Sequence, residues 1–119
     1  MNVAVIGASD KPERYSYQAL MLLQQKGHTT FPVHQRLKII EGQTVYPSIK
    51  DIADPIDTVS LYVAADISSG IAADILGSKP KRIIFNPGAE NPSLAQMAHA
   101  QGITTIEGCT LVMLKASAF

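Results

Sequence analysis

A short loop near the start of the chain carries residue types that bind anions. The apolar run Val3–Ile6 ends at Gly7, and the small residues Ala8 and Ser9 follow it. Glycine permits a sharp turn and a close approach of a ligand to the backbone, and the Ser9 hydroxyl adds a donor. A helix is expected to begin at Pro12 or at the next residue, so the positive end of its dipole faces the loop. Two more side chains that suit an anion stand near the first turn of that helix: Arg14 and Ser16. The loop therefore predicts a phosphate site, and an ordinary strand-to-helix turn is the alternative interpretation.

The loop differs from the usual dinucleotide-binding motif. Ser9 and Pro12 occupy the positions of the second and third glycines of G-x-G-x-x-G. Dinucleotide sites also place an acidic residue at the end of the second strand, where it binds a ribose hydroxyl. Here residues 31–36 read F-P-V-H-Q-R, and the charged residues at this strand end are Arg36 and Lys38. A basic strand end suits a ribose that carries a phosphate, as in NADP or in the 3′-phosphorylated ADP part of coenzyme A.

Alternating strand and helix patterns predict the fold that positions this loop. Five short runs rich in β-branched residues are expected to be strands: Val3–Ile6, Thr29–Val33, Thr58–Val63, Arg82–Phe85 and Thr104–Ile106. Apolar residues recur with helical spacing between them, at Tyr15, Ala19, Leu22 and Leu23, at Ile67, Ile71 and Ile75, and at Leu94, Met97 and Ala98. Asn91 and Pro92 suit the N-cap and first position of the last of these helices. The pattern predicts a Rossmann-like, doubly wound α/β fold: a mainly parallel five-stranded sheet with helices on both faces, in three αβα layers.

The segment between the second and third of these strands does not follow the alternation. A short edge strand is expected at Thr44–Tyr46, and one or two helical turns at Ser48–Ile52. In doubly wound sheets, ligands bind outside the carboxyl ends of the strands, where the strand order reverses. The loop after Ile6 and the strand end after Val33 therefore become the expected site.

Composition limits the classes of function. The 119 residues are expected to form one domain, 1–119. Ten basic and ten acidic residues give a formal net charge of zero, which disfavours nucleic-acid binding. No apolar stretch approaches the roughly 20 residues needed to cross a bilayer, and no secretory signal pattern is present. With a single cysteine, the sequence favours a cytoplasmic protein without a disulfide.

No catalytic or metal-binding constellation stands out. We interpret Cys109 as an ordinary buried cysteine rather than a thiol facing an acyl group, because no base accompanies it. The spacing of the three histidines does not predict a metal site, and His99 is expected to be solvated. Asp66 is interpreted as a helix N-cap. The apolar run Leu111–Leu114 is expected either to pack onto the sheet or to form a contact in a homo-oligomer.

Four segments together resemble a known family. They read G-A-S-D-K-P-E-R-Y-S at 7–16, F-P-V-H at 31–34, E-G-Q-T-V-Y-P-S-I at 41–49 and G-C-T at 108–110. This pattern resembles the small stand-alone CoA-binding domain proteins, which are similar to the CoA-binding Rossmann domain of the succinyl-CoA synthetase alpha subunit. The resemblance covers essentially the whole chain and implies CoA or acyl-CoA as the ligand.

The resemblance also implies which residues bind the ligand. The residues implied for the phosphates are Gly7, Ala8, Ser9, Pro12, Arg14 and Ser16. Those implied for the adenosine end are Val33 and Arg36, with Arg36 near the 3′-phosphate, and Tyr62, Val63 and Ala64 along the adenine. Those implied for the edge toward the pantetheine are Asn86, Pro87 and Gly88. The family usually has P-V-N-P where this chain has P-V-H-Q, and His34 is the residue expected to replace the asparagine as a donor.

Three functions follow as hypotheses. The first is a non-catalytic or accessory protein that binds CoA or acyl-CoA. The second is an enzyme, either an NADP-type reductase or an activity that handles acyl-CoA, which the missing glycines and the lack of a substrate domain disfavour. The third is a regulatory domain without a ligand. The sequence favours a binding protein over an enzyme.

Overall fold

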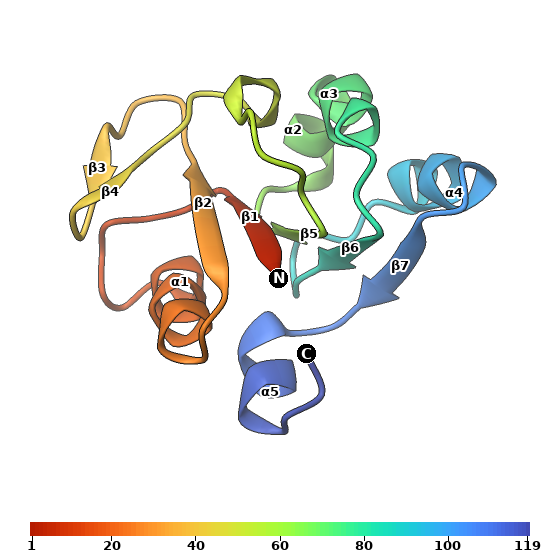
Figure 1. The fold of residues 1–119 in the computed structure, drawn as a ribbon. Helices are drawn as coiled ribbons and strands as arrows, with labels where there is room; N and C mark the ends of the chain where they lie inside the picture. Colours follow the sequence, from red (N-terminus) through yellow and green to blue (C-terminus); the bar gives the residue numbers. More distant parts are fainter.

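A parallel sheet of five strands runs through the middle of the molecule, and the computed structural model describes residues 1–119 (Figure 1). The strands are β1 (Asn2–Ile6), β2 (Thr29–Val33), β5 (Thr58–Leu61), β6 (Arg82–Phe85) and β7 (Thr104–Glu107). Their spatial order is β2-β1-β5-β6-β7, with every pair parallel. Strand β2 lies on one side of β1, and β5, β6 and β7 lie on the other side, which is a doubly wound arrangement. The predicted α/β fold is confirmed.

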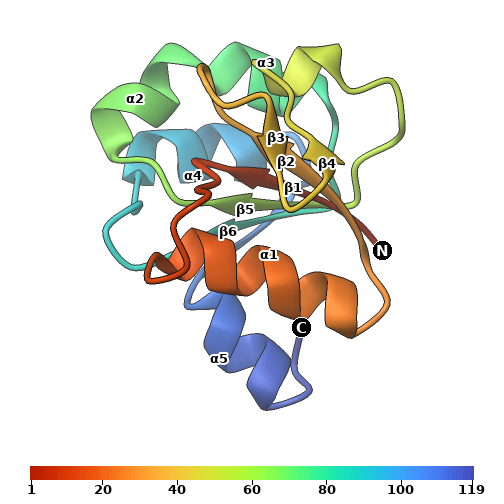
Figure 2. The ribbon, with the colours of Figure 1, turned by 90° about the vertical axis from the view of Figure 1, so that its left-hand side faces the viewer.

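Helices cover both faces of the sheet (Figure 2). One face carries α1 (Tyr15–Gln25) and α5 (Thr110–Lys115), and the other carries α2 (Ala65–Gly70), α3 (Ala72–Gly77) and α4 (Pro92–Ala100). None of these helices is long and apolar enough to span a membrane.

Strand β1 is buried on both faces, which explains its uninterrupted apolar sequence. Successive side chains of a strand point to opposite faces. Val3 and Val5 accordingly pack in the core beneath α1 and α5, whereas Ala4 and Ile6 pack in the larger core beneath α3 and α4. All four are 3% exposed or less. The loop at Gly7 thus starts from a strand that is packed on both faces and paired on both edges.

The segment between β2 and β5 forms a flap beside the sheet. Strands β3 (Ile39–Ile40) and β4 (Gln43–Thr44) pair as a small antiparallel hairpin, and a 3₁₀ turn, η1, spans Ile49–Asp51. Tyr46 forms an isolated bridge with Val33 at the end of β2. The strand expected at Thr44–Tyr46 is therefore shifted, because residues 43–44 pair with their own hairpin and only Tyr46 pairs with the main sheet. The helical turn expected within Ser48–Ile52 is confirmed as η1.

Two expected helices differ from the structure at their boundaries. Helix α1 begins at Tyr15 rather than at Pro12, because Lys11–Arg14 form a turn in which the Arg14 N–H donates to the Lys11 carbonyl at 3.0 Å. Tyr15 is 68% exposed and lies outside the buried face. The helix expected around Ile71 is broken there into α2 and α3, since the Ile71 backbone leaves the helical region at φ −116° and ψ 12°.

Of the two predicted helix caps, one is confirmed and one is wrong. Asn91 caps α4 as predicted, because its side-chain oxygen accepts from the Leu94 N–H at 3.1 Å. Asp66 is not an N-cap: Ala64 occupies that position of α2, and Asp66 lies within the first turn. The run Leu111–Leu114 lies in α5, which packs on the sheet beside α1 with Leu111 and Leu114 buried.

Candidate functional site

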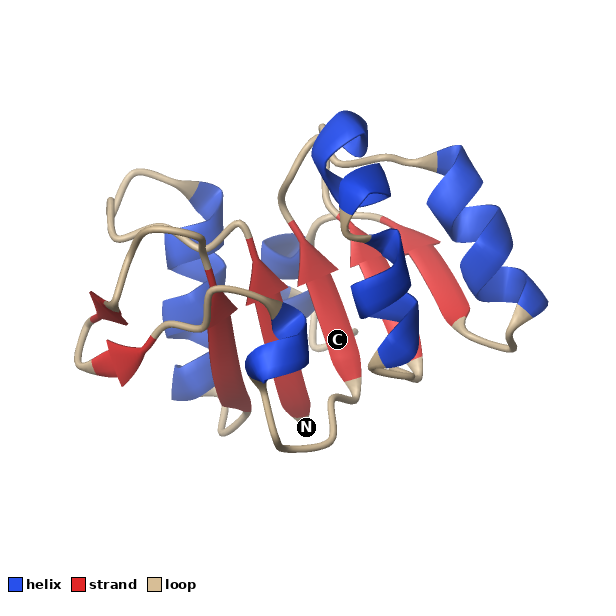
Figure 3. Ribbon diagram, turned by 90° about the horizontal axis from the view of Figure 1, so that it is seen from above, coloured by secondary structure: helices blue, strands red, loops and turns tan.

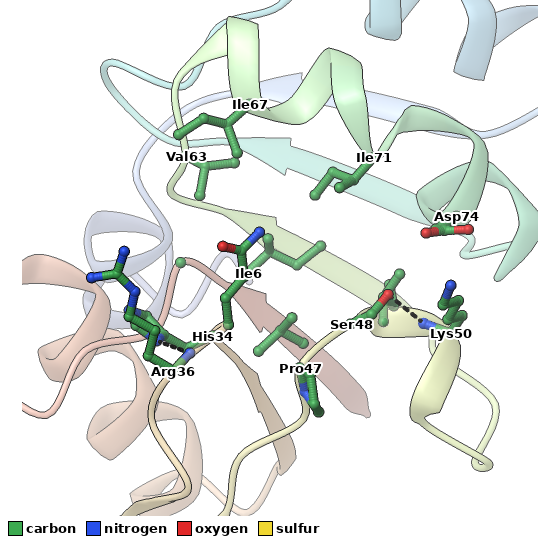
Figure 4. A pocket seen from close by; sticks show the side chains of 14 residues that line it. Ile6, His34, Arg36, Pro47, Ser48, Lys50, Val63, Ile67, Ile71 and Asp74 are labelled. Carbon is green, nitrogen blue, oxygen red and sulfur yellow. Dashed lines mark hydrogen bonds between the residues drawn. The ribbon is translucent and has the colours of Figure 1, made fainter.

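A cleft of about 570 Å³ opens at the carboxyl ends of β1 and β2 (Figure 4). It runs between the flap and helices α2 and α3, on the side of the sheet away from α1. Its size lies within the range of ordinary small-molecule sites. Its lining residues are Ile6, Gly7, Val33, His34, Gln35, Arg36, Pro47, Ser48, Ile49, Lys50, Val63, Ile67, Ile71 and Asp74. Figure 3 shows all the main strands pointing toward the edge at which the loops meet.

The loop at the end of β1 leaves several backbone amides without a partner. The N–H groups of Gly7 and Ala8 both donate to the Val33 carbonyl, at 3.1 and 3.2 Å, so they tie the loop to β2. The N–H groups that donate to no protein atom are those of Ser9, Asp10, Glu13, Tyr15, Ser16 and Tyr17. The last three belong to the first turn of α1, whose dipole favours an anion. The Ser9 hydroxyl accepts from the Lys11 N–H at 3.1 Å and keeps its own hydrogen free to donate.

Gly7 is required at the start of the loop for two reasons. Its φ of 85° lies in the left-handed region that favours glycine. A Cβ at this position would lie 2.9 Å from Cγ1 of Val63 and 3.2 Å from the Tyr62 carbonyl carbon. The close approach of β1 and β5 at their ends therefore depends on this residue.

The strand end after Val33 is held by the imidazole of His34. Its Nδ1 accepts from the N–H of Arg36 at 3.0 Å and from the N–H of Leu37 at 3.1 Å. This arrangement is equivalent to the turn that an asparagine side chain makes with the backbone two residues later. Because Nδ1 accepts within the protein, the ring hydrogen lies on Nε2 and is free to donate, so the role of His34 as a donor to a ligand stays a prediction.

One wall of the cleft is apolar. Ile67 and Ile71 point into the cleft from α2 and the break after it, beside Val63 (Figure 4). Ile67 is 51% exposed. The spacing of Ile67, Ile71 and Ile75 predicted one buried face, but only Ile75 is buried. The break at Ile71 turns the first two side chains toward the cleft, where Ile67 is exposed and Ile71 is partly covered by the core.

The structure does not bring all the expected residues to the cleft. Those that line it are Gly7, Val33, His34, Arg36 and Val63. Ala8 and Ser16 are buried, while Ser9, Pro12 and Arg14 belong to the loop and turn before α1. Tyr62 and Ala64 flank Val63 without lining the cleft, and Pro87 and Gly88 lie exposed in the loop after β6.

Asn86 has an internal role. Its side-chain amide donates to the Ser60 hydroxyl at 3.1 Å and to the Leu61 carbonyl at 3.0 Å, and its oxygen accepts from the Thr110 N–H at 2.8 Å. Asn86 is 1% exposed. Its side chain therefore joins β5, β6 and α5 and is not free to contact a ligand.

Tyr62 and Cys109 lie near this network. The buried Tyr62 hydroxyl lies beside the hydroxyls of Ser60 and Thr110, but has hydrogen-bond geometry with neither. Burial raises the pKa of Tyr62 to about 12. Cys109 is half-buried rather than buried, and it makes no capping hydrogen bond at the start of α5.

The sequence missed the residues of the flap and of the α2–α3 wall. Pro47, Ser48, Ile49 and Lys50 line the cleft because the bridge between Tyr46 and Val33 brings the flap beside β2. The Y-P-S segment was noticed as a motif, which was the available signal for the flap. No signal pointed to Asp74, since its position depends on the break at Ile71.

The fold is the Rossmann-like, doubly wound α/β fold, with a cleft at the carboxyl ends of its strands. Over residues 1–115 the chain matches the family of the CoA binding domain, and it belongs to that family. It is similar to the uncharacterized protein YneT of Bacillus subtilis, with 29% identity over 104 residues, 87% of this chain and 77% of that protein. A crystal structure of an uncharacterized protein superposes with a TM-score of 0.90 at 36% identity, covering 99% of this chain and 97% of the other.

A larger enzyme subunit shares part of the sequence. The alpha subunit of an ADP-forming acetate–CoA ligase (isoform II) of Pyrococcus furiosus is 32% identical over 62 residues. The match covers 51% of this chain and 14% of that subunit. The predicted resemblance to CoA-binding domains is confirmed.

Proposed function

We propose that residues 1–119 act as a single domain that binds coenzyme A or acyl-CoA without a reaction of its own. The observation that supports this most directly is the position of the partnerless loop amides. They adjoin an apolar cleft that begins at Gly7 and carries Arg36 at its edge. Membership in the CoA binding domain family points to the same ligand class.

The parts of CoA are assigned as follows. The diphosphate binds at the amides of Ser9 and Asp10 and at the first turn of α1, with Pro12, Arg14 and Ser16 beside it. The adenosine enters the cleft between Val33 and Val63, flanked by Tyr62 and Ala64. Arg36 meets the 3′-phosphate, and the loop Asn86–Gly88 borders the pantetheine. The Asn86 side chain contributes by fixing that loop from below.

A binding role without catalysis is supported by the lining of the cleft. The protein contains a single ion pair, Lys81–Asp57, which lies outside the cleft. No hydrogen bond or ion pair joins the titratable side chains that line the cleft, so the cleft holds no preassembled pair of nucleophile and base.

Calorimetric titration tests the ligand. CoA is expected to bind more tightly than NADPH or NAD, and tighter binding of NADPH would contradict the assignment. The absence of binding by all three would favour a regulatory domain without a ligand.

The variant Arg36→Glu tests the assignment of the 3′-phosphate. A charge-assisted hydrogen bond contributes about 1.5–3 kcal/mol, so the variant is expected to weaken CoA roughly tenfold or more. Dephospho-CoA, which lacks the 3′-phosphate, should change little. Lys38→Glu is the matched control, because Lys38 is equally exposed and does not line the cleft. Equal losses for CoA and dephospho-CoA would refute the role of Arg36.

A further inference from the structure

We propose that the end of the cleft farthest from Gly7 recognises the amino edge of an adenine base, and that Asp74 is the residue that selects it. This inference rests on the proposed function, because it assumes that a phosphorylated adenosine lies in the cleft. It adds a specificity-determining carboxylate that neither the motifs nor the family resemblance indicates.

Three polar side chains gather at this end of the cleft. Asp74 lies in the first turn of α3, and Ser48 and Lys50 lie across from it on the flap (Figure 4). Helix α3 and η1 pack against each other here. A base that enters beside Val33 and Val63 would therefore meet these polar groups at this end of the cleft.

The polar groups are available to a ligand. The Asp74 carboxylate is half-buried, yet it forms no ion pair with Lys50, since the Lys81–Asp57 pair is the single salt bridge of the protein. No internal hydrogen bond engages it either. The Ser48 hydroxyl accepts from the Lys50 N–H at 3.4 Å, which leaves its own hydrogen free. Both side chains can therefore form hydrogen bonds with a ligand.

The arrangement of donors and acceptor matches adenine. The 6-amino group of adenine donates, and the adjacent ring nitrogen N1 accepts. Asp74 is an acceptor, whereas the Ser48 hydroxyl and the Lys50 ammonium are donors. The faces of the ring would lie between Ile67 and Ile71 on one side and Pro47 on the other. Hypoxanthine has an acceptor at position 6 and a donor at N1, so in the same orientation it would place its oxygen against the Asp74 carboxylate.

The test compares two small ligands that differ only in this edge. Adenosine 3′,5′-bisphosphate and inosine 3′,5′-bisphosphate are titrated calorimetrically into the wild-type protein and into Asp74→Ala. The wild-type protein should prefer the adenosine compound about tenfold, the effect of one charge-assisted hydrogen bond. Asp74→Ala should lose most of this preference, because the change weakens the adenosine compound and relieves the repulsion between the carboxylate and the inosine oxygen.

Controls separate the possible outcomes. Asp54→Ala removes the same charge from an exposed residue outside the cleft and should keep the preference. If the alanine variant is less stable, Asp74→Asn replaces it in the comparison, because it removes the charge of the carboxylate and keeps the shape of the side chain. A wild-type protein that binds both compounds equally, or an Asp74→Ala protein that keeps the full preference, overturns this inference and leaves the binding of CoA intact. If CoA itself fails to bind, the proposed function falls, and the inference falls with it.

Discussion

At the scale of single residues, Gly7 links stability to binding. The variant Gly7→Ala is expected to lower the free energy of unfolding by about 1–2 kcal/mol, because a non-glycine residue is strained in the left-handed region. The added Cβ must also displace Val63, whose Cγ1 lies 2.9 Å away and which lines the cleft. CoA affinity should therefore fall together with stability.

Gly27→Ala is the matched control for this prediction. Gly27 has a similar φ of 89°, but a Cβ there would meet nothing within 4 Å, and the residue lies far along the chain from the loop. Urea denaturation should show a loss of stability in both variants, whereas calorimetry should show weaker CoA binding only in Gly7→Ala. Equal CoA affinities in the two variants would contradict the prediction that Gly7 shapes the binding site.

At the scale of elements, the turn after β2 determines how Arg36 is presented. His34→Ala removes the acceptor of two backbone N–H groups, each bond contributing about 0.5–1.5 kcal/mol, and should loosen residues 34–37. CoA binding should then weaken severalfold and the preference for CoA over dephospho-CoA should shrink. His34→Asn should restore both, because an asparagine oxygen can accept from the same backbone N–H.

Titration of CoA and dephospho-CoA into the two variants checks this prediction. If His34→Ala and His34→Asn behave alike, the turn does not position Arg36. The same comparison tests why this chain tolerates P-V-H-Q where relatives of the family usually have P-V-N-P: the ring nitrogen Nδ1 takes the place of the amide oxygen.

At the scale of the whole molecule, both ends of the chain meet at the amino ends of the strands, away from the cleft at their carboxyl ends. The Met1 amino group lies 3.2 Å from Nδ1 of His28, the Phe119 ring stacks edge-on against His28 at 5.1 Å, and Arg82 lies 4.2 Å over that ring. Burial, the amino terminus and Arg82 lower the pKa of His28, and Asp57 opposes them. Protonating His28 is therefore harder in the folded state than in the unfolded state.

The consequence is a loss of stability in acid. The unfolded state binds the proton first, so the contribution of His28 is fully present above its unfolded pKa of about 6.5 and declines as the pH falls below that value. His28→Gln should reduce the slope of unfolding free energy against pH between about 6.5 and 5. His99→Gln, at an exposed residue of α4, should leave the slope unchanged. Urea denaturation at several pH values in this range measures the slope, and an unchanged slope in His28→Gln would contradict the prediction.

The parts of the fold that follow local patterns were predicted from the sequence. The apolar runs predicted the positions of the strands, since a strand buried on both faces needs apolar residues at every position. Asn91 and Pro92 correctly predicted where α4 begins, because capping depends on residues that are close in sequence. The start of α1 was missed because Arg14 and the turn before it have no strong local signal for an extended backbone.

The sequence by itself determined the fold class and the loop at Gly7, because periodicity and a glycine before a polar turn act over a few residues. Only the tertiary structure decided what surrounds the cleft. The bridge between Val33 and Tyr46 and the position of Asp74 across the cleft from Lys50 each join residues that are distant in sequence. Such contacts depend on how the whole chain packs, and no local pattern encodes them.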